Sequence, residues 1–238
     1  RGSGFRGSTK PGHGEGADRR VRVVVGAPPG DSIDIQARLV AHLLSKFFKH
    51  RFTVENHVGR MGNAAAARVA EAPADGHTLL VVSASFATSV SMHPDLLYHP
   101  QHDFVPIARL ATFHHVLIVN SKLDARTLTE FLELVRARPG RIAIASAGTG
   151  TTSHLAAELM KLRAGWLNAL HVPYRGSAQA LADVLGNHVH ATFTSVSLAQ
   201  GHVRNGRLRA LAVASDERMA ALDEVPTFVE SGFPGLAA

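Results

Sequence analysis

The sequence predicts an α/β fold with a mainly parallel sheet that is covered by helices on both faces. Short runs of β-branched and aliphatic residues, typical of buried strands, alternate with longer stretches whose apolar residues recur every three or four positions, as in amphipathic helices. Glycine-containing turns separate the two kinds of segment. This alternation is typical of strand–helix–strand units, which build parallel sheets.

The chain is long enough to bury a substantial core. Its 238 residues, of which 45% are hydrophobic and 18% charged, suit one large domain or two small ones. It contains no run of about 18 apolar residues, so we expect no membrane-spanning helix, and its N-terminus lacks the apolar core of a signal peptide. A leader that has already been cleaved is compatible with this. The absence of cysteine excludes disulfides and thiolate chemistry and leaves the cellular compartment open.

The net charge of +6 does not indicate a nucleic-acid-binding protein. Residues 1–20 carry five basic and two acidic residues, so half of the excess lies in a glycine-rich segment, which we expect to be a disordered tail. The other basic residues are scattered, and the chain has one Trp and two Tyr, too few for a base-stacking platform. We therefore expect no nucleic-acid partner.

The first half of the chain begins with two strand–turn–helix units. The predicted elements are a strand at 21–25, a turn at 26–32, a helix carrying the apolar positions of 35–48, a strand at 52–56, a helix at 64–70 and a strand at 78–82. Asp31 or Ser32 is expected to begin the first helix. The last strand continues into small hydroxyl residues at 83–89. Ligands of open α/β sheets collect at such carboxyl ends of strands.

The second half begins with two strands in close succession. The predicted strands are residues 105–110 and 116–120, and the gap between them is too short for a crossover helix. A long pair of strands that crosses from one lobe to the other would give this spacing. The remaining predicted elements are a helix at 128–135, a strand at 141–145, a loop at 146–154 followed by a helix, a strand at 169–172, a helix at 178–185 and strands at 190–193 and 208–214.

The loop at 146–154 is the predicted ligand site. It joins a strand to a helix, so backbone N–H groups and the positive end of a helix dipole can hold a carboxylate or phosphate there. Gly148 and Gly150 would let an anion approach the backbone closely. The alternative is an ordinary helix start at which Thr152 or Ser153 serves only as N-cap.

Catalytic and metal motifs are absent from the sequence. It has no G-x-S-x-G elbow and no P-loop lysine, and the third glycine of a dinucleotide fingerprint is replaced by Ser153. The 15 histidines include no H-E-x-x-H, and His114 and His115 point to opposite faces of a strand, so we expect no metal and no cofactor. A domain of an enzyme that binds a phosphorylated substrate at residues 148–152 is the alternative function, although the sequence indicates no acid–base or nucleophile pair near that loop. His154 is either a ligand contact or a residue of the helix face.

Seven motifs in order resemble one known family, the substrate-binding receptors of tripartite tricarboxylate transporters, often called Bug proteins. The resemblance extends from about residue 21 to the end of the chain. The motifs lie at residues 24–34, 54–63, 73–80, 146–155, 171–177, 206–212 and 225–227.

The resemblance implies a two-lobed type II periplasmic-binding architecture without catalysis. Such a receptor lies in the periplasm, closes on a small organic carboxylate and delivers it to membrane transporter subunits, and we expect a monomer. The lobes would comprise residues 21–108 with 212–238, and residues 109–211, with crossings at 104–110 and 208–214. Relatives continue beyond the point where this chain stops, so the C-terminal part of the first lobe is expected to be missing.

The resemblance and the loop chemistry together predict the ligand-binding residues. They are Pro29, Gly30, Ser32, Asp34, Ser83, Ser85, Ser146, Gly148, Thr149, Gly150, Thr151, Thr152, His154, Thr194 and Ser195. Two departures from the family pattern put carboxylate binding in question. Asp31 replaces a usual glycine, and Thr194-Ser195 replaces a frequent Asp-Asn after Phe193. A paralogue that folds but no longer binds a ligand is therefore a third alternative.

Overall fold

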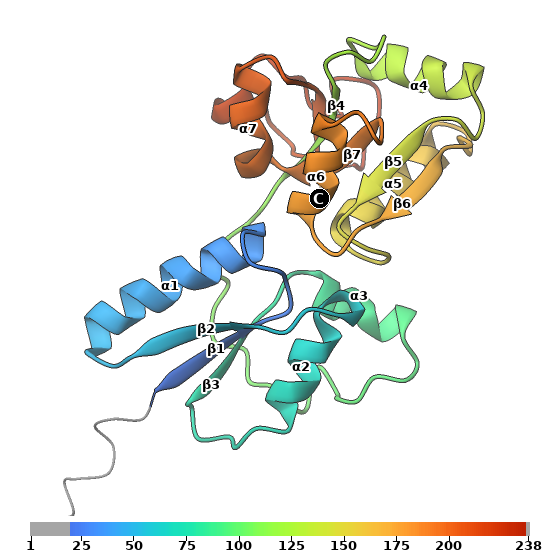
Figure 1. The fold of residues 1–238 in the computed structure, drawn as a ribbon. Helices are drawn as coiled ribbons and strands as arrows, with labels where there is room; N and C mark the ends of the chain where they lie inside the picture. The colour runs from blue at the N-terminus through green and yellow to red at the C-terminus, as the bar shows by residue number, and fades with distance from the viewer. Residues whose placement is uncertain (1–19, 237–238) are drawn as a thin grey trace, which may run out of the picture.

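The structure, a computed structural model, describes residues 20–236 and consists of two lobes (Figure 1). The first lobe comprises residues 20–103 and the second residues 115–236, and the irregular segment 104–114 joins them. The tail predicted to be disordered, residues 1–20, lies outside the described residues except for Arg20. No helix of the described part is long and apolar enough to cross a membrane.

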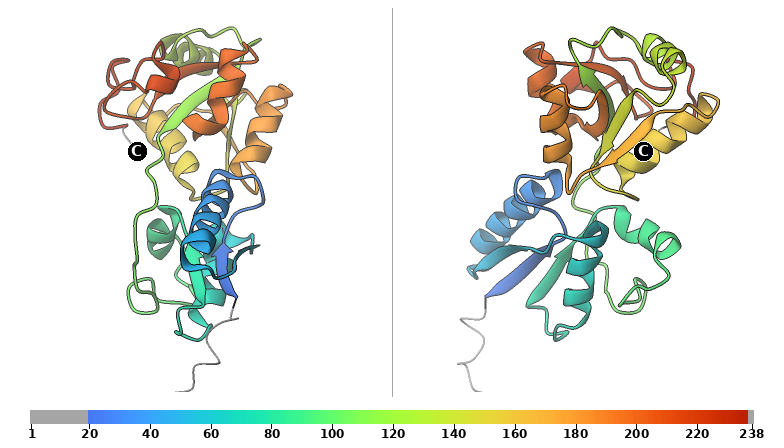
Figure 2. Two further views of the ribbon diagram at one scale, coloured as in Figure 1. Left: turned by 90° about the vertical axis from the view of Figure 1, so that its left-hand side faces the viewer. Right: turned by 45° about the vertical axis from the view of Figure 1, so that its right-hand side comes forward.

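A three-stranded parallel sheet forms the centre of the first lobe. Its order is β2 (Phe52–Asn56), β1 (Val21–Val25), β3 (Thr78–Val81), and the helices are α1 (Ser32–Phe48), α2 (Asn63–Ala70) and α3 (Ser85–Met92), with a short 3-10 turn η1 (Arg60–Gly62) before α2. Helices α1 and α2 lie on opposite sides of the sheet (Figure 2). The strands agree with the prediction to within one residue, whereas residues 85–92, expected only as a strand end, form a helix.

The second lobe contains a five-stranded sheet of the order β6-β5-β7-β4-β8. Its elements are β4 (His115–Asn120), α4 (Leu128–Ala137), β5 (Ala143–Ser146), α5 (Thr152–Arg163), β6 (Leu170–Pro173), α6 (Ser177–Leu185), β7 (Ala191–Ser195), α7 (Val196–Arg204), β8 (Leu208–Val213) and the 3-10 turn η2 (Ala220–Leu222). Strands β5, β6 and β7 are parallel, and β4 runs antiparallel to β7 and β8. The prediction of mainly parallel sheets is confirmed.

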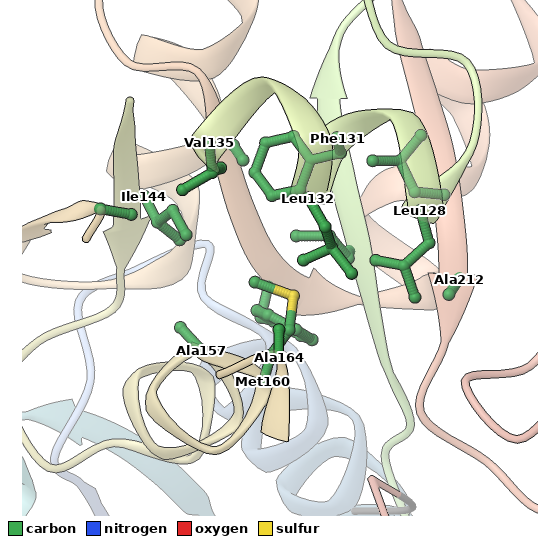
Figure 3. Packing of buried hydrophobic residues seen from close by; sticks show 14 of the residues in the cluster. Leu128, Phe131, Leu132, Val135, Ile144, Ala157, Met160, Ala164 and Ala212 are labelled. Carbon is green, nitrogen blue, oxygen red and sulfur yellow. The ribbon is translucent and has the colours of Figure 1, made fainter. Parts of the chain in front are cut away.

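Helices cover both faces of this sheet, as predicted. Leu117 and Val119 of β4 point to the face covered by α4 and α5, while Val116 and Ile118 point to the face covered by α6 and α7. This alternation is the two-residue period of a strand buried on both sides. Figure 3 shows the first face, where Leu128 and Leu132 lie between α4 and Met160 of α5.

Residues 105–110 do not form the predicted strand. Val105 is 86% exposed and pairs with no strand, and the whole segment from 104 to 114 crosses between the lobes as irregular chain. Pro106 lacks the backbone N–H that would donate a hydrogen bond to a neighbouring strand. An apolar run that contains this proline is therefore a poor candidate for a strand.

The C-terminal residues differ from the expected lobe division. Residues 208–213 form β8 at the edge of the second sheet rather than a second crossing between lobes, and Val213 bridges to Thr227. Phe228 stacks on Phe193 of β7, and Leu236 lies in the same buried cluster. Hydrophobic burial therefore places residues 212–236 with the second lobe. Helix α7, which connects β7 to β8, was not predicted.

Most of the predicted apolar face of α1 does not face the sheet; only Val40 and Leu44 of it are partly buried. The residues of α1 that are buried are Asp34, Ala37 and Ala41, while Phe47 is 79% exposed and Ile35, Leu39 and Leu43 are also exposed. Small alanines let the helix approach a narrow sheet closely, so the bulkier positions turn outward.

The assignment of the C-terminal residues predicts a large effect of Phe228→Ala. Phe228 is 1% exposed, and removing its ring should lower the free energy of unfolding by about 3–5 kcal/mol. Urea denaturation followed by circular dichroism measures this. The neighbouring Val229 is 46% exposed, and Val229→Ala, the control, should cost about 0.5 kcal/mol or less. Equal effects of the two substitutions would contradict the packing of this segment on the second lobe.

Candidate functional site

A cleft of about 800 Å³ lies between the lobes and is lined by residues of both. The first lobe contributes the loop after β1, the turn at residues 58–62 and the start of α3. The second lobe contributes the loop between β5 and α5, the loop between β6 and α6, and the end of β7. This is the carboxyl edge of parallel strands in both sheets, where open α/β folds bind ligands.

Helix N-termini surround the cleft. Of the seven α-helices within residues 20–236, all but α4 begin at, or are capped by, a residue that lines it: Ser32, Gly62, Ser85, Thr152, Ser177 and Ser195. Each helix start carries a partial positive charge on its free N–H groups. The backbone therefore makes the cleft favourable for an anion.

The start of α5 has backbone N–H groups that no side chain caps. Thr151 is the N-cap residue, but its hydroxyl donates to Gly148 O at 2.7 Å instead of accepting from the first turn. Neither of the two expected caps acts as one: the hydroxyl of Thr152 is bonded to His115, and that of Ser153 accepts from the N–H of Ala147 at 3.0 Å. The first-turn amides of Thr152 and Ser153 are thus available to a ligand at the cleft.

Two stacked histidines hold the loop before α5. The rings of His154 and His171 lie 4.0 Å apart, and His154 Nδ1 accepts the N–H of Gly150 at 3.0 Å. His171 Nε2 bonds to Ser146 Oγ at 2.6 Å, and that hydroxyl accepts the N–H of Gly148 at 3.2 Å. Burial lowers the pKa of both histidines; the charge of Lys161 lowers it further, and the charge of Glu158 acts in the opposite direction. They are accordingly neutral at neutral pH, which leaves His154 Nδ1 free to accept.

Asp34 holds the loop after β1 from behind. Its carboxylate accepts from the N–H of Gly30, from Arg38 Nε and from Asn56 Nδ2, at 2.8–2.9 Å. Burial opposes ionisation of Asp34, but the hydrogen bonds from Arg38, Asn56 and Gly30 outweigh it and lower the pKa. Asp34 is therefore a charged anchor of the loop and not part of the cleft wall.

The two lobes touch each other across the cleft at several points. Asp31 Oδ2 accepts the N–H of Ser177 at 2.9 Å, and the hydroxyls of Ser32 and Ser195 lie 2.9 Å apart. Gly150 has φ +81°, and a Cβ there would lie 2.4 Å from Met61 Cε and 2.6 Å from Met92 Sδ of the other lobe. The arrangement is a closed one, in which Gly150 allows the lobes to meet.

The predicted site residues fall into two groups of similar size. Those that line the cleft are Ser32, Ser83, Ser85, Gly148, Thr149, Thr151, Thr152 and Ser195. Those that do not are Pro29, Gly30, Asp34, Ser146, Gly150, His154 and Thr194. In the second group, Ser146 and Thr194 are buried within the sheet. Gly30 is bonded to Asp34 in the first lobe, and Gly150 to His154 in the second.

Several lining residues were not predicted as ligand contacts. They include Phe113, His115, Tyr174, Arg175, Gly176 and Ser177. His115 Nε2 lies 2.8 Å from Thr152 Oγ1, and burial lowers the pKa of this imidazole. Burial and a hydrogen bond to Asp183 raise the pKa of Tyr174 to about 12. The motif at 171–177 could have indicated the last four of these residues. No sequence motif indicated Phe113, near the end of the crossing segment, or His115, the first residue of β4.

The structure does contain hydroxyl–imidazole pairs near the loop, which the sequence did not indicate. One is Ser146 with His171, and the other is Thr152 with His115. Ser146 is fully buried and does not line the cleft, so its hydroxyl cannot reach a substrate there. Within the described residues no group of three or more His, Asp or Glu side chains could hold a metal ion.

Comparison with known proteins identifies the family. The family model described as "Tripartite tricarboxylate transporter family receptor" matches residues 36–238. The chain belongs to this family. The UPF0065 protein in the tcbD-tcbE intergenic region of Pseudomonas sp. (strain P51) is 38% identical over 91% of this chain and 65% of its own length. Protein BugT of Bordetella pertussis is 35% identical over 92% of this chain and 68% of its own length. The chain therefore spans about two thirds of the length of these relatives.

Solved structures confirm the two-lobed periplasmic-binding architecture of this chain. The periplasmic binding protein BugD is 29% identical with a TM-score of 0.86, over 92% of this chain and 73% of its own. Rpa4515 of R. palustris with adipate is 33% identical with a TM-score of 0.87, over 91% and 73%. MatC of Rhodopseudomonas palustris with bound malate is 30% identical with a TM-score of 0.86, over 92% and 75%.

The neutral histidines predict that acid destabilises the fold. Burial lowers the pKa of His115, His154, His171 and His190 below the ordinary 6.5, so the unfolded chain binds more protons than the folded protein under mildly acidic conditions. The free energy of unfolding should therefore be highest above pH 6.5 and fall as the pH is lowered through it, by up to about 1.4 kcal/mol per pH unit for each such histidine.

Urea titrations at a series of pH values measure this slope. His190 Nδ1 accepts the N–H of Ala143 at 3.0 Å, so His190→Asn keeps an acceptor but removes the titration, and the slope should become shallower. A stability that is constant, or that rises on acidification between pH 7 and about pH 5.5, would contradict neutral histidines in the fold.

Proposed function

We propose that the chain is an extracytoplasmic solute-binding receptor that captures a small organic carboxylate in the cleft for a membrane transporter. The observation that supports this most strongly is the convergence of helix N-termini on one cavity, with the amides of α5 uncapped. Carboxylates are the ligands that such amides hold. Family membership supports the same class, as do the structures of Rpa4515 with adipate and of MatC with bound malate.

In this proposal the first turn of α5 holds the carboxylate. The amides of Thr152 and Ser153 donate to it, while hydroxyls of the cleft wall contact the rest of the ligand or its water; these belong to Ser32, Ser83, Ser85, Thr149, Thr152 and Ser195. The residues behind the wall, Ser146, Gly150, His154 and Asp34, keep the two loops in place. Closure of the lobes by hinge motion would then enclose the ligand.

The cellular role is part of the proposal. The periplasmic location, the membrane transporter subunits and a monomeric state rest on the family alone. The comparisons give no support to the alternative of an enzyme acting on a phosphorylated substrate, since the family is one of receptors and BugD is a periplasmic binding protein. A turnover assay on phosphorylated metabolites would detect such an activity if the assignment were wrong.

A thermal-shift screen over mono-, di- and tricarboxylates is the direct test of the proposed function. A ligand at about 100 times its dissociation constant should add roughly 2.7 kcal/mol to the free energy of unfolding. The absence of any shift over the whole set would contradict a carboxylate receptor and favour a paralogue that no longer binds.

The site predicts opposite results for two substitutions of Thr149. This residue is exposed in the loop before α5 and lines the cleft. Thr149→Asp places a fixed negative charge beside the carboxylate position and should weaken binding of a carboxylate at least about tenfold. It should not destabilise the protein, since a negative charge near a helix start is favourable.

Thr149→Asn, the matched control, has nearly the same shape as the aspartate and no charge, so its affinity should stay within about threefold of the parent. Titration calorimetry with an acid found in the screen measures both variants, and circular dichroism verifies folding. Equal affinities of the Asp and Asn variants would place the anion away from this loop.

A further inference from the structure

Asp31 is a carboxylate inside the cleft that is already bound to helix N-termini. Its residue is 5% exposed and lines the cavity. Oδ1 accepts the N–H of Ile33 at 3.3 Å, which caps α1, and Oδ2 accepts the N–H of Ser177 at 2.9 Å, in the first turn of α6. One side chain therefore serves two helices from opposite lobes, and Figure 1 shows the first turn of α1 beside α6.

The contact with α6 has the features of a built anion position. The N-cap residue of α6 is Gly176, which has no side chain to cap the helix itself. A Cβ at Gly176 would lie 2.7 Å from Pro28 Cγ and 3.3 Å from Asp31 Oδ2, so only glycine allows the loop after β1 to come this close. The amide of Ser177, at the start of α6, thus donates to the Asp31 carboxylate of the other lobe. At the start of α5 no side chain accepts from the first-turn amides.

Nearby arginines do not neutralise this charge within the cavity. Two arginines line the cleft, and Arg60 is paired with Asp95. Arg175 is exposed to solvent, where water screens its charge. Asp31 is 5% exposed and lines the cavity, so water screens its negative charge from a ligand less than it would screen an exposed carboxylate.

We propose that Asp31 is a specificity-determining residue that fills the α6 anion position and limits this receptor to ligands with a single carboxylate. This inference rests on the proposed function. The ligand carboxylate binds at α5, and the opposite end of the ligand, which faces Asp31, is neutral or a hydrogen-bond donor. A second carboxylate at that end would meet a buried charge of the same sign and would find the α6 amide occupied.

Matched pairs of acids test this proposal by titration calorimetry. Butyrate with succinate, hexanoate with adipate, and 4-methylbenzoate with terephthalate each share a carbon skeleton, and in each pair a methyl group of the first acid is a carboxylate in the second. The variants are Asp31→Asn and Asp31→Ser, since both residues can cap α1 without a charge. Glu133→Gln is the matched control, because it removes the same charge from an exposed position on α4, the helix that does not begin at the cleft.

The parent protein should bind the monocarboxylate of a pair more tightly than the dicarboxylate. In both Asp31 variants the affinity for the dicarboxylate, divided by that for the monocarboxylate of the same pair, should rise at least about tenfold. Glu133→Gln should leave this ratio unchanged. Circular dichroism confirms that the variants are folded.

Three results would overturn the inference. The parent could bind a dicarboxylate as tightly as its partner, or the ratio could stay the same in both Asp31 variants. Loss of all binding from both folded variants would show that Asp31 holds the lobes together and does not select ligands. If none of the acids bound to the parent or to any variant, the proposed function itself would fail, and the inference would fail with it.

Discussion

The direction of a parallel strand fixes where the following helix begins, and the cleft depends on this constraint. In both lobes a strand leads through a short loop into a helix, so helix N-termini gather at the carboxyl edge of each sheet. The two edges face one another across the cavity. Partial positive charges from six helix starts therefore act at one place, and an anion can be held there by backbone rather than by cationic side chains.

Backbone donors are useful only if they are held in position, and each main loop is fixed from behind. The Gly148–Gly150 turn is bonded to Ser146 and His154, whose partner ring His171 comes from the neighbouring strand β6. The loop after β1 is bonded to Asp34. Such pre-organisation reduces the ordering cost of binding. Ser146, His154 and Asp34 therefore serve the site by fixing its loops, although none of the three lines the cleft.

Local patterns predicted what depends on local chemistry. Strands 21–25 and 52–56, the α5 loop and the fold class all follow from apolar runs, glycines and caps, and the structure agrees. Tertiary packing decided the rest. An apolar run with a proline became the exposed crossing at 104–114, and the 212–236 segment joined the second lobe because its apolar side chains found a core there. His154 faces its own loop rather than the cleft, since it accepts from Gly150 and stacks on His171 of β6, and the sequence left open which of the two it would face.

The central claim is that the amides at the start of α5 hold the ligand carboxylate. Amide proton and nitrogen shifts, followed by two-dimensional NMR during titration with the tightest-binding acid, test it most directly. The account predicts that the amide protons of Thr152 and Ser153 show the largest downfield shifts, as expected for charge-assisted hydrogen bonds, while that of Gly150 changes little because it is already bonded to His154. Saturable binding that leaves the Thr152 and Ser153 amides unshifted would contradict the account.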